Sequence, residues 1–442
     1  MALWCSHCQT TTPRKNAMST SILYHTQGIR GFKHVSFHYH EGVVEERIIR
    51  KYQHCPVCGS SHVSAYRRGT RVVTGLPIGS KALWLCFDVH NIYCHRCGRQ
   101  TAERIPFLKT PKSRITRLLE QTIIEYHSCM SILAISQYFG LRWHTVKDVQ
   151  LRYLRKEYGD VSCKGVTAIG IDEIMVGHTP SGGQRYLTIV RNLHTGEVLW
   201  VGNGKGLDAL NGFEKRLEKS KAKIEYITMD LGQTFTSWAQ ANLPGATIIY
   251  DHFHVIKLVN DGLDKVRRST MEKLEEEQRQ SLKKQRYLFL RNAEDLAPAA
   301  KEHLEIIKSI SRDLGTMHTM KEDVRAIYST TINSLEAKCQ LKQWIVSARK
   351  CSIEVLTRIS NTIERRLDGI TAFWDTRLSN SHMEGFNSKL RGLIKMANGY
   401  TDDEFFKLRI YDLPDQKMID LTCLPSERDE LRHEIIYPNS TS

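Results

Sequence analysis

The sequence has no run of about 18 or more apolar residues, so it predicts no transmembrane helix. Residues 1–12 also lack the basic and apolar regions of a secretory signal. Neither an internal repeat nor a long low-complexity tract is visible. We therefore expect a globular protein of the cytoplasm.

Acidic residues are few relative to basic ones. Asp and Glu number 48 against 63 Lys and Arg, which gives a net charge of +15 and a pI near 9.2. This balance favours a polyanionic partner, nucleic acid first and an anionic membrane second. The charged content of 25% and hydrophobic content of 41% are typical of a globular protein. At ~150 residues per domain, the length suggests about three domains.

Twelve cysteines are present, and four of them form two well-spaced C-x-x-C pairs followed by glycine. Without a secretory signal, such pairs indicate metal binding in a reducing compartment. Two pairs together make a closed, tetrahedral and therefore structural zinc site. The intervening ranges 63–67, 70–74 and 82–92 read as strands, so we expect a zinc ribbon with one Zn²⁺ rather than unrelated free thiols. Its ligands would be Cys55, Cys58, Cys94 and Cys97.

Two further features near these cysteines leave alternatives open. Cys5 and Cys8 form a third pair without a second half, either a site completed by a histidine or, as we prefer, part of a disordered end. Basic side chains flank the ribbon and either contact phosphate or form a solvated surface. They are Arg67, Arg68, Arg71, Lys81, Arg96 and Arg99.

Residues 113–158 show helical periodicity with a glycine turn. Apolar residues recur at helical spacing in three stretches, and Gly140 lies between the second and the third. This layout is that of a helix-turn-helix, whose last helix enters the major groove; the alternative is an ordinary three-helix bundle with a basic face. Beside a basic zinc ribbon we favour DNA binding. The polar positions expected to contact DNA include Arg142, His144, Thr145, Lys147 and Arg152.

Two apolar stretches that read as strands end in aspartates, and a distant helical stretch carries a glutamate. The strands close on Asp172 and Asp230, and the helix around Glu384 has Asn380 or Ser381 as a possible N-cap. Neighbouring strands can bring two such aspartates together. Phosphodiester chemistry uses two divalent cations, and Mg²⁺ prefers hard oxygen ligands. Two strand-end aspartates followed by a helical glutamate indicate an RNase H-like fold.

The chain resembles bacterial insertion-sequence transposases of the ISL-three type, which combine a zinc ribbon, a helix-turn-helix and a DDE catalytic domain. The resemblance runs from about residue 50 to 411. It rests most on Asp-His-Phe-His-Val at 251–255 and on Glu-Gly-Phe-Asn-Ser-Lys at 384–389. It implies that Asp172, Asp230 and Glu384 are the catalytic, metal-binding triad, with two Mg²⁺ or Mn²⁺ per site.

The resemblance also implies an activity and partners. The protein would bind the terminal inverted repeats of an insertion sequence and catalyse metal-dependent DNA cleavage and strand transfer. Its partners would be double-stranded DNA, both transposon ends and target, and at least a second copy of the chain in the synaptic complex. It would be nucleoid-associated when bound.

The chain is thus expected to be a multidomain α/β protein whose RNase H-like core is interrupted by helices. The long interval between Asp230 and Glu384 requires an inserted domain. The expected segments are 1–40, unassigned; 41–108, zinc ribbon; 109–160, helix-turn-helix; 161–256, first part of the core; 257–375, helical insertion; 376–411, last core helix; and 412–442, C-terminal tail.

Several side chains outside the triad have two readings. Asp251, His252, His254 and Asn387 are possible neighbours of the active site or structural hydrogen-bond partners; Asn387 lies at i+3 from Glu384 and could orient it or contact DNA. The helical insertion is either a spacer or a DNA clamp or dimer contact. Its expected DNA contacts, with one from the last core helix, are Lys265, Arg267, Arg268 and Lys389.

Two rival functions use the same architecture. One is a DNA-binding regulator that has lost cleavage, although its acids would then have no reason to be intact. The other is a nuclease without strand transfer. An assay for joined DNA products separates all three.

Overall fold

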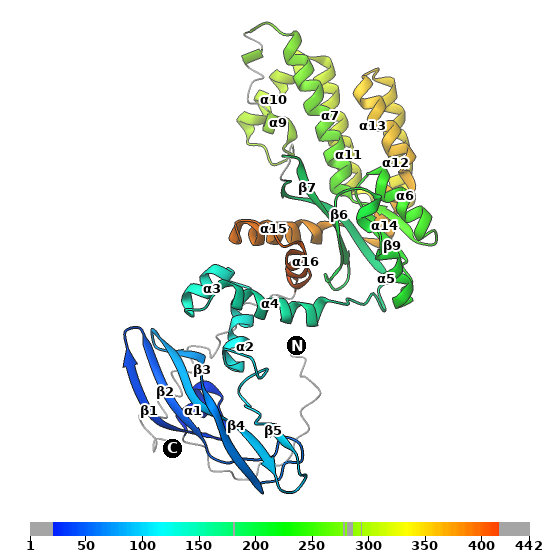
Figure 1. Cartoon of the computed structure of the whole chain (residues 1–442). Helices are drawn as coiled ribbons and strands as arrows, with labels where there is room; N and C mark the ends of the chain where they lie inside the picture. Colours follow the sequence, from blue (N-terminus) through cyan, green and yellow to red (C-terminus); the bar gives the residue numbers. More distant parts are fainter. Residues whose placement is uncertain (1–20, 180–181, 277–278, 281–285, 293, 415–442) are drawn as a thin grey trace, which may run out of the picture. The chain divides into compact units, whose positions relative to one another are not determined.

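The computed structural model describes residues 21–414 except 180–181, 277–278, 281–285 and 293 (Figure 1). The predicted pair Cys5–Cys8 lies outside the described residues, as does most of the expected C-terminal tail. The chain divides into two compact units, one up to Tyr153 and the other from Leu154. No helix among the described residues is long and apolar enough to cross a membrane.

The first unit begins with a short helix and a five-stranded sheet. Helix α1 is Ile22–Gln27, and the strands run in the order β1-β2-β4-β3 with β5 paired to β4. All neighbours are antiparallel except β2 and β4, which are parallel. The strands are β1 Phe32–His40, β2 Val43–Arg50, β3 Val63–Ile78, β4 Lys81–Cys94 and β5 Gln100–Ala102.

This sheet corrects two expectations. The boundary expected at residue 41 falls between β1 and β2, which pair along their whole length, so residues 32–40 belong to the sheet. The ranges 63–67 and 70–74 form one strand rather than two, because a bulge between Arg67 and Gly69 lets the pairing with β4 continue. Periodicity is misleading here because a bulge shifts the side-chain alternation.

Three helices follow the sheet in the first unit, and the last of them continues past the boundary at Tyr153. They are α2 Arg117–Tyr126, α3 Ile132–Tyr138 and α4 Trp143–Tyr158. The hydroxyls of Thr116 and Ser131 accept backbone N–H groups of α2 and α3 and so cap their starts. Gly140, with φ of 62°, makes the turn before α4. Seven apolar residues at helical spacing form one buried cluster: Ile115, Leu119, Ile123, Ile135, Phe139, Val146 and Val149. Three others expected on the same faces, Leu118, Ile132 and Tyr153, are half-buried.

The second unit is built on a mixed five-stranded sheet with the order β10-β9-β6-β7-β8. β6, β7 and β8 form an antiparallel meander, whereas β9 and β10 run parallel to β6. Helices α5 Phe213–Ser220 and α6 Gln233–Asn242 separate the later strands. The strands are β6 Ala168–His178, β7 Gln184–Asn192, β8 Val198–Asn203, β9 Tyr226–Met229 and β10 Thr247–Tyr250, with a 3₁₀ turn at Leu207–Leu210.

A block of helices follows β10 and precedes the last part of the unit. The block contributes a row of buried apolar residues to the same core as one face of the sheet. It contains α7 His252–Lys273, α9 Arg286–Leu290, α10 Pro298–Ile310, α11 Arg312–Thr330, α12 Ser334–Lys350, α13 Glu354–Arg365 and α14 Leu367–Thr376.

The other face of the sheet is covered by α15 Ser381–Met396 and α16 Asp403–Asp412. Alternate residues along the strands face the two cores: Val190 belongs to the core of the helical block, and Ile189 to the core formed with Phe386 and Phe406. Helix α15, far along the chain, is therefore held against β6 by an apolar face of its own.

Candidate functional site

Asp172 and Asp230 lie close together in the second unit, on neighbouring strands. Burial raises the pKa of Asp172, and the charge of Asp230 raises it further, while a hydrogen bond from Asn387 and the nearby His254 lower it. Asp230 follows the last residue of β9 as predicted. Asp172 does not end its strand as predicted, because β6 continues to His178. The pairing of β6 with β9 stops at Gly170, but its antiparallel pairing with β7 continues to His178 and keeps this part of the chain in the sheet.

Local hydrogen bonds fix both carboxylates. The Oδ1 of Asp172 accepts the N–H of Glu173 at 2.8 Å, and the Oδ1 of Asp230 accepts the N–H of Gly232 at 2.8 Å. A Cβ at Gly232 would lie 2.7 Å from that same Oδ1, so glycine allows this close approach. Because Gly232 precedes the first residue of α6, Asp230 is placed at the positive end of that helix.

Glu173 is a third acid beside Asp172 and Asp230, and no role for it was predicted from the sequence. Burial and then the charge of Asp230 raise its pKa to about 7, against the opposing effect of Lys205. Its position directly after Asp172 was the available signal. The three carboxyl groups are close enough for their charges to oppose one another, so a cation nearby would favour their ionised forms.

Helix α15 meets this cluster through Asn387. Its Nδ2 donates to the Oδ2 of Asp172 at 2.7 Å, so Asn387 lies beside this aspartate, as predicted, and its amide holds the carboxylate. Glu384 lies one turn earlier on α15 and is exposed. Among the described residues, the four ribbon cysteines form the one group of three or more side chains whose ligand atoms lie close enough to hold a metal ion. The ligand atoms of the three predicted triad members lie farther apart than that.

Asn380, immediately before α15, fastens the helix to three parts of the core. Its Oδ1 accepts a hydrogen bond from Thr228 of β9, and its Nδ2 donates to the carbonyl of Ile171 at 3.3 Å. Its backbone N–H donates to Asp251 at 3.4 Å. The residue occupies the N-cap position, as predicted, but its side chain makes no capping hydrogen bond to α15. That side chain bonds to the sheet instead.

The predicted motif residues Asp251, His252 and His254 have different surroundings in the structure. Asp251 is buried, beside His252 at 3.4 Å, and it faces the start of α15 through Asn380. The ring of His252 packs near Tyr328 and Phe373 of the helical block. His254 is the member of this motif that lies near Asp172. Asp251 and His252 thus join elements, while His254 is close enough to Asp172 for its charge to act on that carboxyl group.

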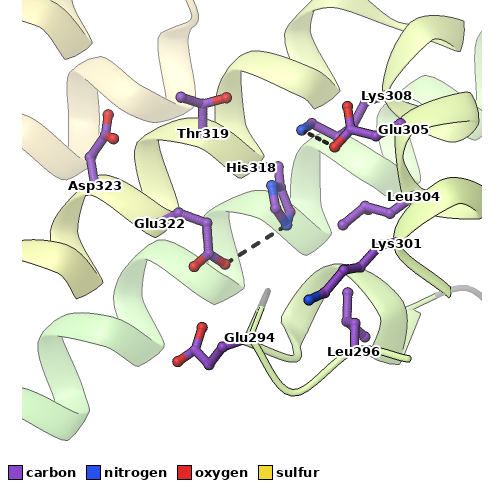
Figure 2. Close-up of a pocket in the computed structure, with 10 residues that line it drawn as sticks. All are labelled: Glu294, Leu296, Lys301, Leu304, Glu305, Lys308, His318, Thr319, Glu322 and Asp323. Atoms are coloured by element: carbon purple, nitrogen blue, oxygen red, sulfur yellow. Dashed lines mark hydrogen bonds and ion pairs between the residues drawn. The ribbon is translucent and has the colours of Figure 1, made fainter. Parts of the chain in front are cut away.

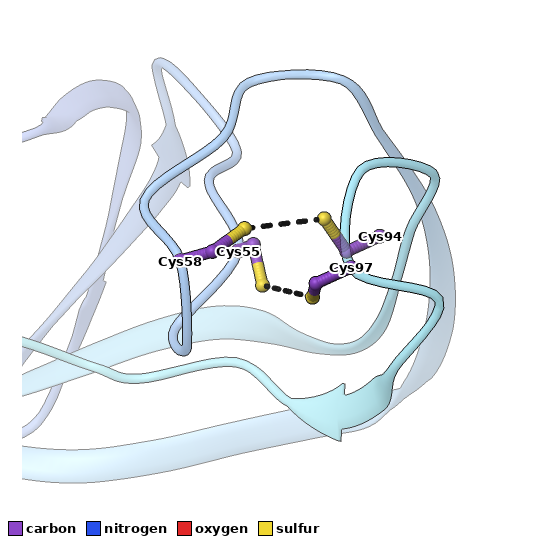
Figure 3. Close-up of side chains that lie close together, drawn as sticks. All are labelled: Cys55, Cys58, Cys94 and Cys97. Carbon is purple, nitrogen blue, oxygen red and sulfur yellow. Dashed lines mark hydrogen bonds between the residues drawn. The ribbon is translucent and has the colours of Figure 1, made fainter.

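The four ribbon cysteines come together at one end of the first unit's sheet (Figure 3). The Sγ atoms of Cys55 and Cys97 are 3.7 Å apart, those of Cys58 and Cys94 are 3.5 Å apart, and all four lie within 4.8 Å. Burial opposes ionisation of Cys94, but backbone N–H groups of Cys97 and Arg96 bring its pKa down to about 6. Four thiols at these distances fit the tetrahedral zinc site predicted from their spacing.

The side chains predicted to contact DNA from the helix-turn-helix lie in α4 or just before it. Arg142 and His144 are exposed, and Thr145 and Lys147 are half-buried. The guanidinium of Arg152 donates to Glu120 at 3.0 Å. All five residues belong to the first unit, and their contact with DNA stays a prediction.

The helical block contradicts one predicted DNA contact. Arg267 is 8% exposed, and its guanidinium donates to Asp264 at 2.8 and 3.0 Å, so the prediction is wrong for this residue. Arg267 lies one turn after Leu263, which is buried on the same helix, so its side chain shares the inward face of α7. Lys265 and Arg268 are exposed, as is Lys389 on α15.

The comparisons with known families fit this architecture. A family model of ISL3-type DDE proteins, described as "Transposase", matches residues 169–410. The chain belongs to the ISL3 transposase family. A second model, the "Helix-turn-helix domain of transposase family ISL3", matches residues 103–154. The resemblance predicted from the sequence motifs is therefore confirmed.

Individual relatives of this ISL3 transposase are distant but nearly full-length. The transposase for insertion sequence element IS1001 of Bordetella parapertussis is 26% identical over 80% of this chain and 87% of its own. The transposase for IS1557 of Mycobacterium tuberculosis is 25% identical over 78% and 82%. The Drosophila P element transposase strand transfer complex covers 72% of this chain and 96% of that one at 15% identity and a TM-score of 0.37, below the level of a shared fold.

Proposed function

We propose that this ISL3 transposase binds the terminal inverted repeats of its insertion sequence and cleaves and joins DNA with Asp172, Asp230 and Glu384 as metal ligands. The observation that carries the proposal is the bond between Asn387 and Asp172. It brings the helix of Glu384 against the strand of one aspartate, next to the other. The family match at 169–410 spans all three acids.

We also propose that the core of the second unit is RNase H-like. The support is its strand order, in which an antiparallel meander is extended by two parallel strands beside its first strand. The helical block then interrupts this core between β10 and α15, as the long interval before Glu384 requires. We likewise propose the other expected segment boundaries; the boundary at residue 41 is excluded because it would separate the paired strands β1 and β2.

The donor set suits a hard divalent cation. Asp172, Glu173 and Asp230 offer carboxylate oxygens, and burial followed by mutual repulsion raises the pKa values of Asp172 and Glu173. When bound, two Mg²⁺ or Mn²⁺ ions would stabilise the attacking and leaving oxygens of an in-line displacement at phosphorus. Glu384 would complete the set from α15.

The protein's own groups would then perform three tasks. Asp230, held by the amide of Gly232, and Asp172, held by Asn387, keep fixed positions. His254, whose charge acts on Asp172, would take a proton from the attacking water or 3′-hydroxyl. No side chain has to bond covalently to DNA, because those oxygens are the nucleophiles.

The rest of the chain would supply recognition and assembly. The first unit would carry one structural Zn²⁺ on its four cysteines and would read end DNA with α4. Two ends must be held together for joining, so we propose a dimer or larger assembly during synapsis.

The decisive experiment incubates purified protein with labelled element-end duplex, target plasmid and Mg²⁺. Wild type should give joined products, and Asp172→Asn, Asp230→Asn and Glu384→Gln should each abolish them. Glu218→Gln changes an exposed acid on α5 and serves as the matched control. Manganese titration by calorimetry supplies a readout independent of turnover, and the three variants should bind less metal.

The other outcomes separate the rivals. Cleaved but unjoined ends would indicate a nuclease. End binding without any product, unchanged in the three variants, would indicate a regulator and overturn the enzymatic proposal.

A further inference from the structure

A basic segment crosses from the sheet of the first unit to its helix-turn-helix. We call residues 109–117 the basic strap. The chain from Arg104 to Arg117 contains no acidic residue. The basic residues of this stretch are Arg104, which precedes the strap, and Lys109, Lys112, Arg114 and Arg117, which belong to it.

Both ends of the strap are anchored in apolar cores. Phe107 and Leu108, just before it, are buried in the core of the sheet. Ile115 is buried in the core of the helix-turn-helix. Lys112 and Arg114, between these anchors, are exposed. The strap is thus a bridge whose ends are buried and whose charges face solvent.

Strand β3 holds the strap along its length. The guanidinium of Arg71 donates to the carbonyls of Pro111 and Ser113 at 2.6 and 2.7 Å. Thr74 exchanges two backbone hydrogen bonds of 2.9 Å with the strap, giving its N–H to Arg114 and accepting from Thr116. A bridge pairs Thr74 with Ile115. The backbone is therefore fixed before any ligand binds, which lowers the entropy cost of a contact.

Ion pairs set the strap's position relative to α4. The buried carboxylate of Glu120, on α2, lies 3.5 Å from the Nζ of Lys109 and 3.0 Å from the guanidinium of Arg152 on α4. A cavity of about 300 Å³ is lined on one side by Lys112 and Arg114 and on the other by Thr145 and Arg152. The exposed cations of the strap thus share a surface with the helix expected in the major groove.

A second cavity, of about 610 Å³, adjoins the strap on the side of the sheet. Arg68, Arg71, Arg104, Lys109 and Arg117 line it. Glu103 is the acidic residue that lines this cavity, and its carboxylate lies 2.9 Å from the guanidinium of Arg50 and 3.1 Å from the ring of His90. The helix-turn-helix family model starts at residue 103 and so includes the strap.

We infer that the basic strap contacts the sugar–phosphate backbone beside the groove entered by α4, with Lys112 and Arg114 as the contacting residues. The inference rests on the proposed binding of element ends and adds a second DNA-contacting element to it. Phosphate is the fitting partner because the strap presents cations on a fixed backbone. Such contacts fix register on the duplex without reading bases.

The test measures binding of the full chain to element-end duplex and to unrelated duplex over a range of salt concentrations, by fluorescence anisotropy. Each lost phosphate contact lowers the slope of log Kd against log salt by about 1. Lys112→Ala/Arg114→Ala should lower the slope by about 2 and weaken both duplexes by the same factor. Lys33→Ala/Lys51→Ala removes two exposed lysines, one on the edge strand β1 and one just after its neighbour β2, and should leave the slope unchanged.

A second variant tests the fixed backbone. Arg71→Lys keeps the charge but cannot bridge two carbonyls in the same way, so affinity should fall with the slope unchanged. Wild-type binding to element ends that is no better than to unrelated DNA overturns the proposed function. Specific wild-type binding, with an unchanged slope in Lys112→Ala/Arg114→Ala or a loss confined to element-end DNA, overturns the strap alone.

Discussion

The side-chain amide of Asn387 donates a 2.7 Å hydrogen bond to the Oδ2 of Asp172 and so joins helix α15 to strand β6. The two residues lie at opposite ends of the family match, separated in sequence by the helical block. The other oxygen of this carboxylate accepts the backbone N–H of Glu173, so both oxygens are held in place. This bond therefore links the position of α15 directly to the orientation of the Asp172 carboxylate.

Asn387→Ala should lower DNA cleavage about 10- to 100-fold, the usual cost of removing a group that orients a metal ligand. Burial raises the pKa of Asp172 and the bond from Asn387 lowers it, so removing the bond lets that pKa rise. A carboxylate must be ionised to bind metal, so the acid limb of the rate profile should move to higher pH. Cleavage rates measured across the acid and neutral range report both effects. Ser388→Ala, at an exposed neighbouring position, should change neither, and an unmoved acid limb in Asn387→Ala would contradict the assigned role.

Gly170→Ala should destabilise the second unit. A Cβ there would lie 3.0 Å from the Oδ1 of Asn380 and 3.1 Å from the Oγ1 of Thr228, the two atoms that share a hydrogen bond. Crowding a packed interior costs about 1–3 kcal/mol, and here it would also loosen the start of α15. Thermal unfolding and hydrogen exchange of α15 measure the loss.

Gly245→Ala is the matched control for that change, since nothing lies within 4 Å of its added Cβ. If Gly170→Ala leaves both the unfolding midpoint and the protection of α15 at wild-type values, Asn380 does not fasten the helix in the way described.

The parts of this molecule that could be predicted from the sequence have strong local signals. The spacing of Cys55, Cys58, Cys94 and Cys97 and the periodicity of α2 to α4 depend on contacts a few residues apart or on chemistry that few other patterns share.

The parts that could not be predicted depend on tertiary partners. Asp172 reads as a strand end, because pairing with β7 beyond it has no local signal. Arg267 reads as a DNA contact because its partner Asp264 could equally have faced solvent. The bonds of Asn380 to Thr228 and Ile171 join residues far apart in the sequence, so no spacing rule reveals them.

Cys97→Ser should remove zinc from the first unit. The purified chain should contain about one zinc ion, and loss of one of four thiolates should release it, because a closed site needs all four ligands. A structural zinc contributes folding free energy directly, so the midpoint of thermal unfolding of this unit should fall. Elemental analysis and calorimetry measure both. Cys339→Ser changes an exposed cysteine of the helical block and should retain the metal; a zinc-free wild type with the same stability as Cys97→Ser would contradict the site.

His318 should make the helical block less stable in mild acid. It lines a cavity of about 490 Å³ with Glu322 and Lys301, and it is 3% exposed (Figure 2). Burial, and then the charge of the buried Lys321, lower its pKa to about 4, whereas an unfolded histidine titrates near 6.5. Between these values the unfolded chain binds a proton that the folded chain does not. Above about pH 6.5 His318 therefore does not reduce stability, and its titration lowers the free energy of unfolding by up to about 3 kcal/mol as the pH approaches about 4.

His318→Gln removes this titration and should reduce the difference between the unfolding midpoints measured at about pH 7.5 and about pH 5, on either side of the unfolded pKa. In the wild type the Nε2 of His318 lies 3.8 Å from the carboxylate of Glu322. The glutamine amide keeps a polar group at this position, so the cavity stays polar. His178→Gln alters an exposed histidine at the end of β6 and should leave the wild-type difference intact. If His318→Gln loses as much stability in acid as wild type does, another group must account for the loss, because the glutamine side chain cannot take up the proton.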